Sequence, residues 1–159
     1  MLLGWPARHS ASPRLHNAAF RAAGLDLVYL AAPTPPEALA TVVAALGAIG
    51  AVGANVTVPH KQVVVDLCDE VSEEAVLIGA VNTLVWEEQG LTGENTDARG
   101  LADDLARTVA PAPGERWLLL GTGGAARAAA VAIGRARGVL VVAGRRPEAA
   151  ATIAALAER

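Results

Sequence analysis

The sequence predicts an α/β protein, with an N-terminal α/β domain followed by the first part of a Rossmann-type nucleotide-binding domain. Short strand-like apolar runs alternate with helix-like segments over roughly the first 109 residues. After the proline-containing stretch 110–114, an apolar run over 117–120 without alternation predicts a parallel strand that is buried on both sides. This strand leads directly into a glycine-rich loop and an alanine-rich helix. We therefore expect a first α/β domain over 1–109, a linker over 110–114 and a partial Rossmann-type domain over 115–159.

Strands and helices are expected to alternate in the first domain. Strands are expected over 1–3, 27–31, 51–58 and 79–86, and the last of these turns at 88–90 into 91–92. Helices are expected over 14–23, from about 37 to 46, over 62–68, after Ser72, and from 97 to 109. Ser12 suits an N-cap, with Pro13 at the first helical position, and Gly24 ends that helix. Thr34 and Glu37 have the spacing of a capping box.

The composition excludes several classes of protein. Of the 159 residues, 53% are hydrophobic and 18% are charged, which is typical of a globular chain. The net charge is −3 and the thirteen basic residues are scattered, so we expect no nucleic-acid surface. The single cysteine precludes an internal disulfide, the apolar runs are too short to span a bilayer, and no signal peptide is recognisable. We expect a soluble cytoplasmic protein without a membrane segment.

Polar side chains follow the strand predicted over 51–58. Alternation places Asn55 and Thr57 on one face of this strand and the two valines of 55–58 on the other. Pro59 ends the strand because it has no N–H to donate, and Lys61 follows where a helix can begin. An amide, a hydroxyl and an amine at one strand end predict a site for a small polyhydroxylated molecule. The alternative is a polar turn with a solvated lysine.

A glycine-rich loop follows the strand predicted over 117–120. Gly121, Gly123 and Ala126 fit the three small positions of G-x-G-x-x-G/A, where the backbone N–H groups at a helix N-terminus face a pyrophosphate. The alternative is close helix–strand packing through small residues. The next strand, predicted over 139–143, ends in residues expected to complete the cofactor site, and the expected cofactor-binding residues are Gly121, Gly123, Gly124, Ala125, Arg145 and Arg146.

The position that distinguishes the two nicotinamide cofactors carries no acid. An NAD site would place Asp or Glu about twenty residues after the loop, to accept from the ribose hydroxyl. Here Arg145 and Arg146 stand in that place, and paired guanidinium groups suit a 2′-phosphate. The sequence therefore favours NADP, with a solvated arginine pair as the alternative.

Five motifs in this order resemble the shikimate dehydrogenases: Gly4–Pro6 with His9–Asn17, Asn55–Lys61, Gly79–Thr83, Gly93–Asp97 with Gly100, and Gly121–Ala126. The resemblance implies reduction of 3-dehydroshikimate to shikimate with NADPH, in the pathway to the aromatic amino acids. It also implies that residues 1–109 form the substrate-binding and catalytic domain and that residues 115–159 form part of the NADP-binding domain. The alternatives are a quinate/shikimate dehydrogenase and a non-catalytic shikimate-binding fragment.

The resemblance also implies roles for individual residues. The hydroxyls of Ser10 and Ser12 would bind the substrate carboxylate, Lys61 would be the catalytic acid/base, paired with Asp97, and Asn55 would lie nearby. The ring hydroxyls would be held by Thr57, Asn82 and Asp97. Local alternatives remain, because serine and aspartate also cap helices and asparagine favours turns. The three histidines have no metal-binding spacing, and we expect no metal.

The sequence departs from the family pattern in two places. The phosphate clamp of the family usually reads Asn-Arg-Thr or Asn-Arg-Ser, whereas Gly144 and Arg146 occupy its outer positions here. The later family segments, including a substrate tyrosine and the loops on the nicotinamide side, have no counterpart in residues 1–159. We therefore expect weak shikimate binding without turnover from these residues alone. We also expect self-association through an uncovered 139–143 strand and an uncovered last helix.

Overall fold

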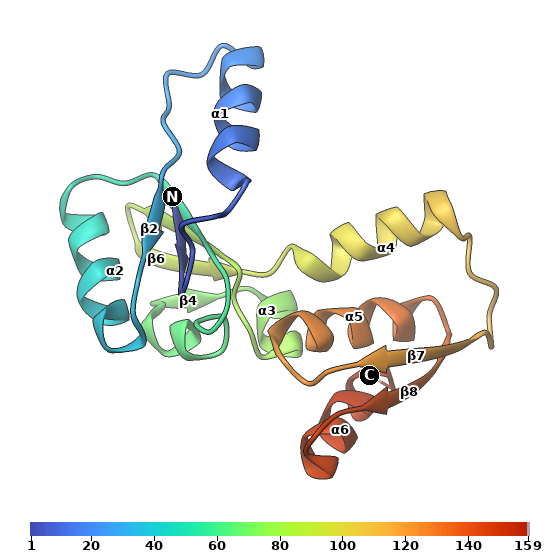
Figure 1. Ribbon diagram of the computed structural model, residues 1–159. Coiled ribbons are helices and arrows are strands. Elements are labelled where there is room, and N and C mark those ends of the chain that lie inside the picture. Colours follow the sequence, from blue (N-terminus) through green and yellow to red (C-terminus); the bar gives the residue numbers. More distant parts are fainter. Residues whose placement is uncertain (159) are drawn as a thin grey trace. The chain divides into compact units, whose positions relative to one another are not determined.

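The computed structural model describes residues 1–158, which form two compact units (Figure 1). The first unit comprises Met1–Val71 and Val81–Glu94, and the second comprises Ser72–Ala80 and the chain from Asn95 onward. Each unit is built around its own sheet. The α/β class predicted from the sequence is confirmed.

The first unit contains a six-stranded mixed sheet in the order β2-β1-β3-β5-β6-β4. Its strands are β1 (Leu2–Gly4), β2 (Ala31–Pro33), β3 (Gly53–Val56), β4 (Glu70–Val71), β5 (Thr83–Glu87) and β6 (Gly90–Glu94). Strand β1 pairs in parallel with β2 and β3, whereas β5 pairs antiparallel with β3 and β6. The helical segments are α1 (Ser12–Ala22), η1 (Pro36–Ala38), α2 (Leu39–Ala48) and η2 (Val63–Leu67).

The inward face of this sheet is built from alternating apolar residues. Leu3 and Leu84 are fully buried and Val56 is nearly so, each on a different central strand. The alternation predicted for the third strand stops at Val56, because β3 ends there and Val58 is 68% exposed. Thr57 instead donates its N–H to the carbonyl oxygen of Leu3 at 2.8 Å, beyond the end of the strand.

Several local predictions for this unit are wrong. The strand expected over 27–31 lies later, at β2, because the side chain of Asn17 bonds both the N–H and the carbonyl of Tyr29 and so replaces strand pairing there. Ser12 is the first residue of α1 rather than its N-cap. Thr34 does not form the predicted capping box, since its hydroxyl donates to the carbonyl of Ala32.

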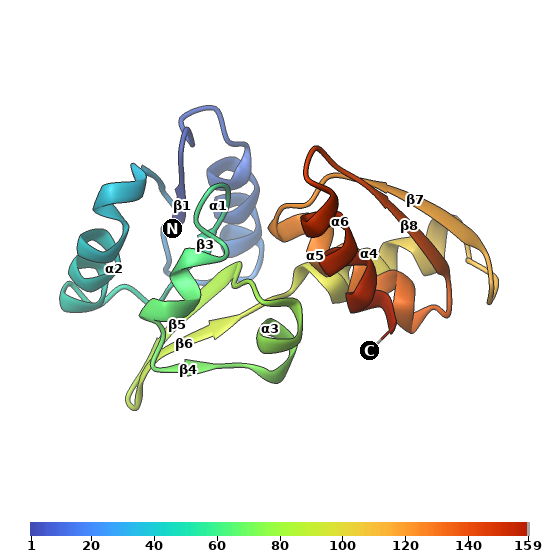
Figure 2. The same ribbon diagram turned by 90° about the horizontal axis from the view of Figure 1, so that it is seen from below.

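The second unit is organised around helix α5 (Gly124–Arg135). Its other elements are α3 (Glu73–Ile78), α4 (Asp97–Thr108), β7 (Arg116–Leu120), β8 (Val139–Ala143), α6 (Pro147–Ala154) and η3 (Ala155–Glu158). Strands β7 and β8 pair in parallel, and α6 connects to η3 beside them (Figure 2). The strand–loop–helix–strand order predicted after the linker is confirmed.

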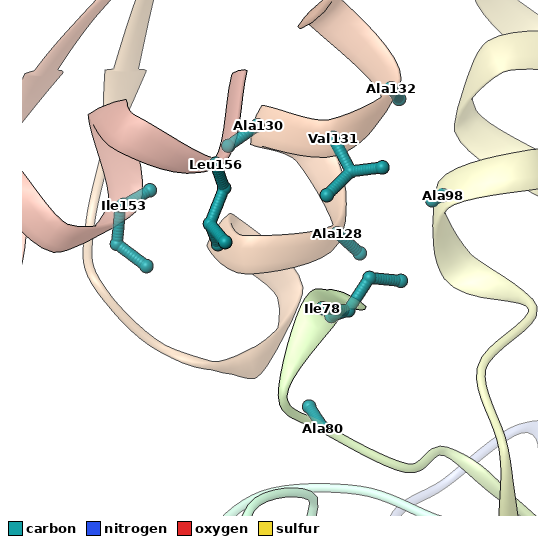
Figure 3. Packing of buried hydrophobic residues seen from close by; sticks show 9 residues of the cluster. All are labelled: Ile78, Ala80, Ala98, Ala128, Ala130, Val131, Ala132, Ile153 and Leu156. Carbon is teal, nitrogen blue, oxygen red and sulfur yellow. The ribbon is translucent and has the colours of Figure 1, made fainter. Parts of the chain in front are cut away.

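The core of this unit packs against small residues of α5 (Figure 3). Val131 and three alanines of α5 are buried among side chains from α3, α4, α6 and η3. Alanine allows close approach between helices, and Gly134 goes further, because an added Cβ would collide with the backbone of Ala157. Ile153 and Leu156 are buried in this core, so the prediction that the last helix presents an uncovered apolar face is wrong.

Helix α3 belongs to the second unit because α5 holds it at both ends. Ile78 is fully buried in the shared core, and its carbonyl accepts a hydrogen bond from Nε of Arg127. At the other end of α3, Arg135 forms a two-pronged ion pair with Glu74, with one N–O distance of 2.8 Å, and this bond raises the pKa of Arg135. The compact units therefore differ from the predicted ranges 1–109 and 115–159, and the assignment of one function to each range stays a prediction.

One face of the β7–β8 pair is exposed, contrary to the expectation of a strand buried on both sides. Leu118 and Leu120 are 66% and 75% exposed, and Val139 and Val141 are 49% and 47% exposed. The alternate residues Leu119, Leu140 and Val142 pack against the core. The prediction that the 139–143 strand is uncovered is therefore confirmed for the outer face of this strand. No helix within residues 1–158 is long and apolar enough to cross a bilayer.

The burial of Ile78 predicts a large difference between two substitutions in α3. Ile78→Ala should lower the free energy of unfolding by roughly 2–5 kcal/mol, because it leaves a cavity against α5. Val76→Ala in the same helix removes a side chain that is 64% exposed and should change it by less than about 0.5 kcal/mol. Urea denaturation followed by tryptophan fluorescence measures both, and equal effects would contradict this packing.

Candidate functional site

The strand directions of the first unit bring three segments to one edge of its sheet. Strands β1 and β3 are parallel, so the segments that follow them leave at the same edge, and β5, antiparallel to β3, begins there. The N–H of Trp5 bonds the carbonyl of Val58 at 3.0 Å, which joins the first two segments. The N–H of Val56 bonds the carbonyl of Asn82 at 2.7 Å, which joins the third.

Ser10 and Ser12 are brought together at the start of α1. The hydroxyl of Ser10 donates to Oγ of Ser12 at 3.1 Å and accepts the backbone N–H of Ser12 at 3.1 Å. Both hydroxyls thus lie at the N-terminus of an eleven-residue helix, where backbone N–H groups favour negative charge. This arrangement suits a carboxylate.

Thr57 is fixed against β1 by a glycine. A Cβ added to Gly4 would collide with the Cγ2 methyl of Thr57, so only glycine lets the two strand ends approach this closely. Because threonine is stiff at χ1, placement of its methyl group against Gly4 also sets the direction of its hydroxyl.

Asn82 is held on both sides by backbone hydrogen bonds. Its N–H donates to the carbonyl of Glu94 at 2.9 Å, and its carbonyl accepts the N–H of Val56. The residue is only 7% exposed, and its Oδ1 accepts the hydroxyl hydrogen of Thr83 at 2.8 Å. Asn82 is therefore a fixed residue between two strands, and a simple turn role does not describe it.

Lys61 lies in a short loop that a buried histidine secures. Nε2 of His60, which is 2% exposed, lies 2.7 Å from the carbonyl oxygen of Thr34. A carbonyl only accepts, so this nitrogen carries the proton. The carbonyl of Lys61 accepts the N–H of Val81 at 2.7 Å, which fixes the lysine backbone beside the start of the Asn82 segment.

Asp97 is the first residue of α4, in the second unit. The buried side chain of Asn95 positions it, since Asn95 donates to the carbonyl of Ala80 at 2.8 Å and accepts the N–H of Asp97 at 2.9 Å. The predicted pairing of Lys61 with Asp97 joins residues of different units and stays a prediction.

The glycine-rich loop of the second unit fits a pyrophosphate. Gly121 has φ +117°, which glycine adopts without strain, and its N–H donates to the carbonyl of Ala143 at 2.8 Å. Within residues 121–135, all of them described, α5 has no side-chain cap, and added Cβ atoms at Gly121 and Gly123 would meet nothing within 4 Å. The N–H groups at Gly124 and Ala125 are therefore open to a phosphate.

The structure explains the unusual glycine between β8 and the arginine pair. An added Cβ at Gly144 would lie 2.7 Å from Cγ2 of Thr122, so the asparagine common in the family pattern would require Thr122 to move. Arg145 and Arg146 follow and are exposed, which leaves their guanidinium groups accessible to a phosphate.

A cavity of about 640 Å³ in the first unit is lined by Tyr29, Asn55 and Thr83 among others, and within the described chain none of the predicted substrate-binding residues lines it. Among residues 1–158, no three His, Cys, Asp or Glu side chains gather as metal ligands.

The sheet edge with its polar side chains and the glycine-rich strand–loop–helix together define an α/β protein with a Rossmann-type segment. Residues 2–84 match the family described as the shikimate dehydrogenase substrate binding domain, and the chain belongs to this family.

Known relatives are similar to this chain in sequence and structure over nearly its whole length. The shikimate dehydrogenase (NADP(+)) of Citrifermentans bemidjiense is 49% identical over 161 residues, covering 99% of this chain and 56% of that protein. A crystal structure of a shikimate dehydrogenase in complex with NADP+ matches with a TM-score of 0.91 at 39% identity, covering 98% of this chain and 54% of that one. The shikimate 5-dehydrogenase of Thermus thermophilus in complex with shikimate gives 0.90 at 39% identity, with 99% and 60% coverage. The chain thus spans somewhat more than half the length of these relatives.

Sequence reasoning missed three supporting residues. His60 secures the Lys61 loop through its contact with Thr34. The side chain of Asn17 bonds the backbone of Tyr29 in place of a neighbouring strand, and Thr83 bonds the side chain of Asn82. All three lie within motifs that carry the family resemblance. The first two bond residues far away in the chain, so the sequence alone could not show what they do.

The contact between Gly4 and Thr57 predicts a reversible defect. Gly4→Ala should destabilise the fold by about 1–3 kcal/mol, because the added methyl collides with Cγ2 of Thr57. Adding Thr57→Ser removes that methyl, keeps the hydroxyl and should recover at least about 0.5 kcal/mol. Gly100→Ala, where an added Cβ meets nothing within 4 Å, is the control for a glycine substitution. Thermal or urea denaturation measures these variants beside Thr57→Ser alone and the wild type, and additive effects in the double variant would contradict the contact.

Proposed function

We propose that this chain forms the substrate-binding part and the first half of the cofactor-binding part of an NADP-dependent shikimate dehydrogenase, which interconverts 3-dehydroshikimate and shikimate. The observation that supports the proposal is the arrangement of the strands: the segments that carry Ser10, Thr57, Lys61 and Asn82 all leave or enter a single sheet at one edge. A carboxylate site and a hydroxyl site joined by one amine match a small hydroxylated ring acid.

The substrate carboxylate would bind at the start of α1. The hydroxyls of Ser10 and Ser12 are already in contact and can each donate to one carboxylate oxygen, while the helix N-terminus favours the negative charge. The ring hydroxyls would then meet Thr57, Asn82 and Asp97. Asn82 and Thr57 are held by backbone bonds before any ligand binds, so little ordering is required of them.

Lys61 would exchange the proton. NADPH, when bound, supplies the hydride that reduces the carbonyl carbon. As negative charge develops on the carbonyl oxygen, the Lys61 ammonium can donate a proton to it, and the neutral amine can take that proton back in the reverse reaction. Lys61 is the single lysine among thirteen basic residues, the other twelve being arginine, which does not lose its proton in proteins. Asp97 would hold the ammonium group by pairing.

The second unit would bind the adenosine half of NADP. Backbone N–H groups at Gly124 and Ala125 would donate to the pyrophosphate, where Gly121 and Gly123 leave room for its close approach. Arg145 and Arg146 would hold the 2′-phosphate by charge-assisted bonds. The expected partners are therefore a small-molecule substrate and NADP, in a cytoplasmic biosynthetic enzyme. The exposed Leu118, Leu120, Val139 and Val141 support self-association of the isolated chain.

Lys61 offers a direct test of this function. In a preparation that oxidises shikimate with NADP+, Lys61→Ala should lower kcat by about a hundredfold or more, the scale of general acid/base catalysis. Lys61→Arg keeps the positive charge but cannot exchange the proton, so it should lose turnover while its Kd for shikimate changes little. Initial-rate assays and calorimetry measure the two quantities. Turnover by Lys61→Arg near the wild-type rate would contradict the proposed role.

Cofactor preference tests the arginine pair. NADP+ should bind more tightly than NAD+, and Arg145→Ala should remove about 1–3 kcal/mol of that preference, because a charge-assisted contact to the 2′-phosphate is lost. Arg107→Ala, in the last turn of α4, is the matched control and should leave the preference unchanged. Fluorescence titrations with both cofactors measure this. Equal wild-type affinities would contradict the assignment and favour the quinate/shikimate alternative, which a parallel assay with quinate checks.

A further inference from the structure

Tyr29 begins a relay of side-chain hydrogen bonds that ends at Asn82. The Tyr29 hydroxyl donates to Oδ1 of Asn55 at 2.7 Å, and Nδ2 of Asn55 donates to Oγ1 of Thr83 at 3.3 Å. The Thr83 hydroxyl then donates to Oδ1 of Asn82 at 2.8 Å. Asn55 and Thr83 are directly opposed across β3 and β5, so the strand pairing itself places the two middle members together.

The direction of hydrogen-bond donation along this relay is set by Tyr29, its first member. Tyr29 is 5% exposed, and burial raises the pKa of its hydroxyl to about 12, so the phenol keeps its proton at neutral pH. A donating phenol requires the oxygen of the Asn55 amide to face it, which turns the amide nitrogen towards Thr83. Thr83, accepting from Asn55, directs its one hydroxyl hydrogen to the oxygen of Asn82.

Tyr29 is also attached to the helix that carries the serine pair. Its backbone N–H and carbonyl both bond the side chain of Asn17 at 2.8 Å, and Asn17 bonds the carbonyl of Pro13 at 2.7 Å in the first turn of α1. The Tyr29 ring stacks on His16 of the same helix, with centroids 4.2 Å apart and planes 6° from parallel. The tyrosine thus connects the start of α1 with the Asn82 segment.

We propose that Tyr29 is a positioning residue that, through Asn55 and Thr83, fixes which atom of the Asn82 amide faces a bound ring hydroxyl. The oxygen of Asn82 accepts from Thr83, so the amide nitrogen, a donor with two hydrogens, is the atom that points away from Thr83 and would donate to the substrate. The site thereby selects a hydroxyl group that can accept a hydrogen bond at this position. This inference rests on the proposed shikimate site and adds to it a residue outside that site.

Two conservative variants interrupt the hydrogen-bond relay in different ways. Tyr29→Phe keeps the stacked ring and removes only the first donor. Asn55→Asp keeps the shape and still accepts from Tyr29, but a carboxylate also accepts from Thr83 and so draws the hydroxyl hydrogen away from Asn82. Thr92→Val is the matched control, because it removes a hydroxyl of the same sheet whose bond goes to the exposed carboxylate of Glu87.

Calorimetric titration of the 159-residue chain with shikimate tests the functional consequence. Tyr29→Phe should raise the Kd about three- to tenfold and Asn55→Asp about tenfold or more, the range of one lost or reversed hydrogen bond. Thr92→Val should leave the Kd unchanged. The melting temperature of Asn55→Asp should stay near that of the wild type, which separates misorientation of Asn82 from a general loss of structure. Wild-type affinity in both relay variants would overturn the inference.

The side-chain amide resonances of Asn82 test the relay without any ligand. In ¹⁵N-labelled protein, both relay variants should shift these resonances and speed their hydrogen exchange, whereas Thr92→Val should not. If the wild type fails to bind shikimate, the proposed function fails, and this measurement still decides the relay. Asn82 resonances that are unchanged in Tyr29→Phe and Asn55→Asp would overturn it.

Discussion

The pairing of β3 with strands of opposite direction is the constraint on which the candidate site depends. Because β3 runs parallel to β1 and antiparallel to β5, the ends of two strands and the beginning of a third meet at one edge of the sheet. The hydrogen bond between Val56 and Asn82, at 2.7 Å, closes this junction. A slip of one residue between β3 and β5 would place Asn55 and Thr83 on opposite faces of the sheet. The position of each polar side chain therefore follows from strand pairing that the apolar core enforces.

Small residues serve different purposes in the two units. In the first unit, Gly4 allows Thr57 to lie against β1, and this contact sets the orientation of Thr57, a proposed substrate-binding residue. In the second unit, the alanines of α5 and Gly134 allow neighbouring elements to pack closely. Helix α3 joins that core although its sequence lies within the range predicted for the substrate domain. Buried contacts of Ile78, rather than position along the chain, decide where it belongs.

The sequence was sufficient for features with a local physical cause. Turn residues predicted the hairpin of β5 and β6, although β5 begins at Thr83 rather than at residue 79, and the spacing of Gly121 and Gly123 predicted the loop before α5. It was insufficient where a distant partner decides the outcome. The strand expected near Tyr29 is displaced by the side chain of Asn17, and the cap expected from Thr34 is lost because that hydroxyl bonds Ala32. The five motifs predicted the residues of the proposed site, whereas the contacts around those residues became visible only between segments that are separate in the sequence.

The central claim is that the sheet edge around Lys61 binds shikimate, and the composition of the chain permits an unusually direct test. Reductive methylation with ¹³C-formaldehyde labels amines, and Lys61 is the single lysine, so the two labelled groups are Lys61 and the α-amino group of Met1. Met1 precedes β1 and donates to Gly53 at 2.9 Å, at the opposite end of the strands, which makes its signal an internal reference. On titration with shikimate, the Lys61 methyl signal should show a saturable shift while the Met1 signal stays constant. A Lys61 signal that does not move up to millimolar shikimate, or equal shifts of both signals, would contradict it.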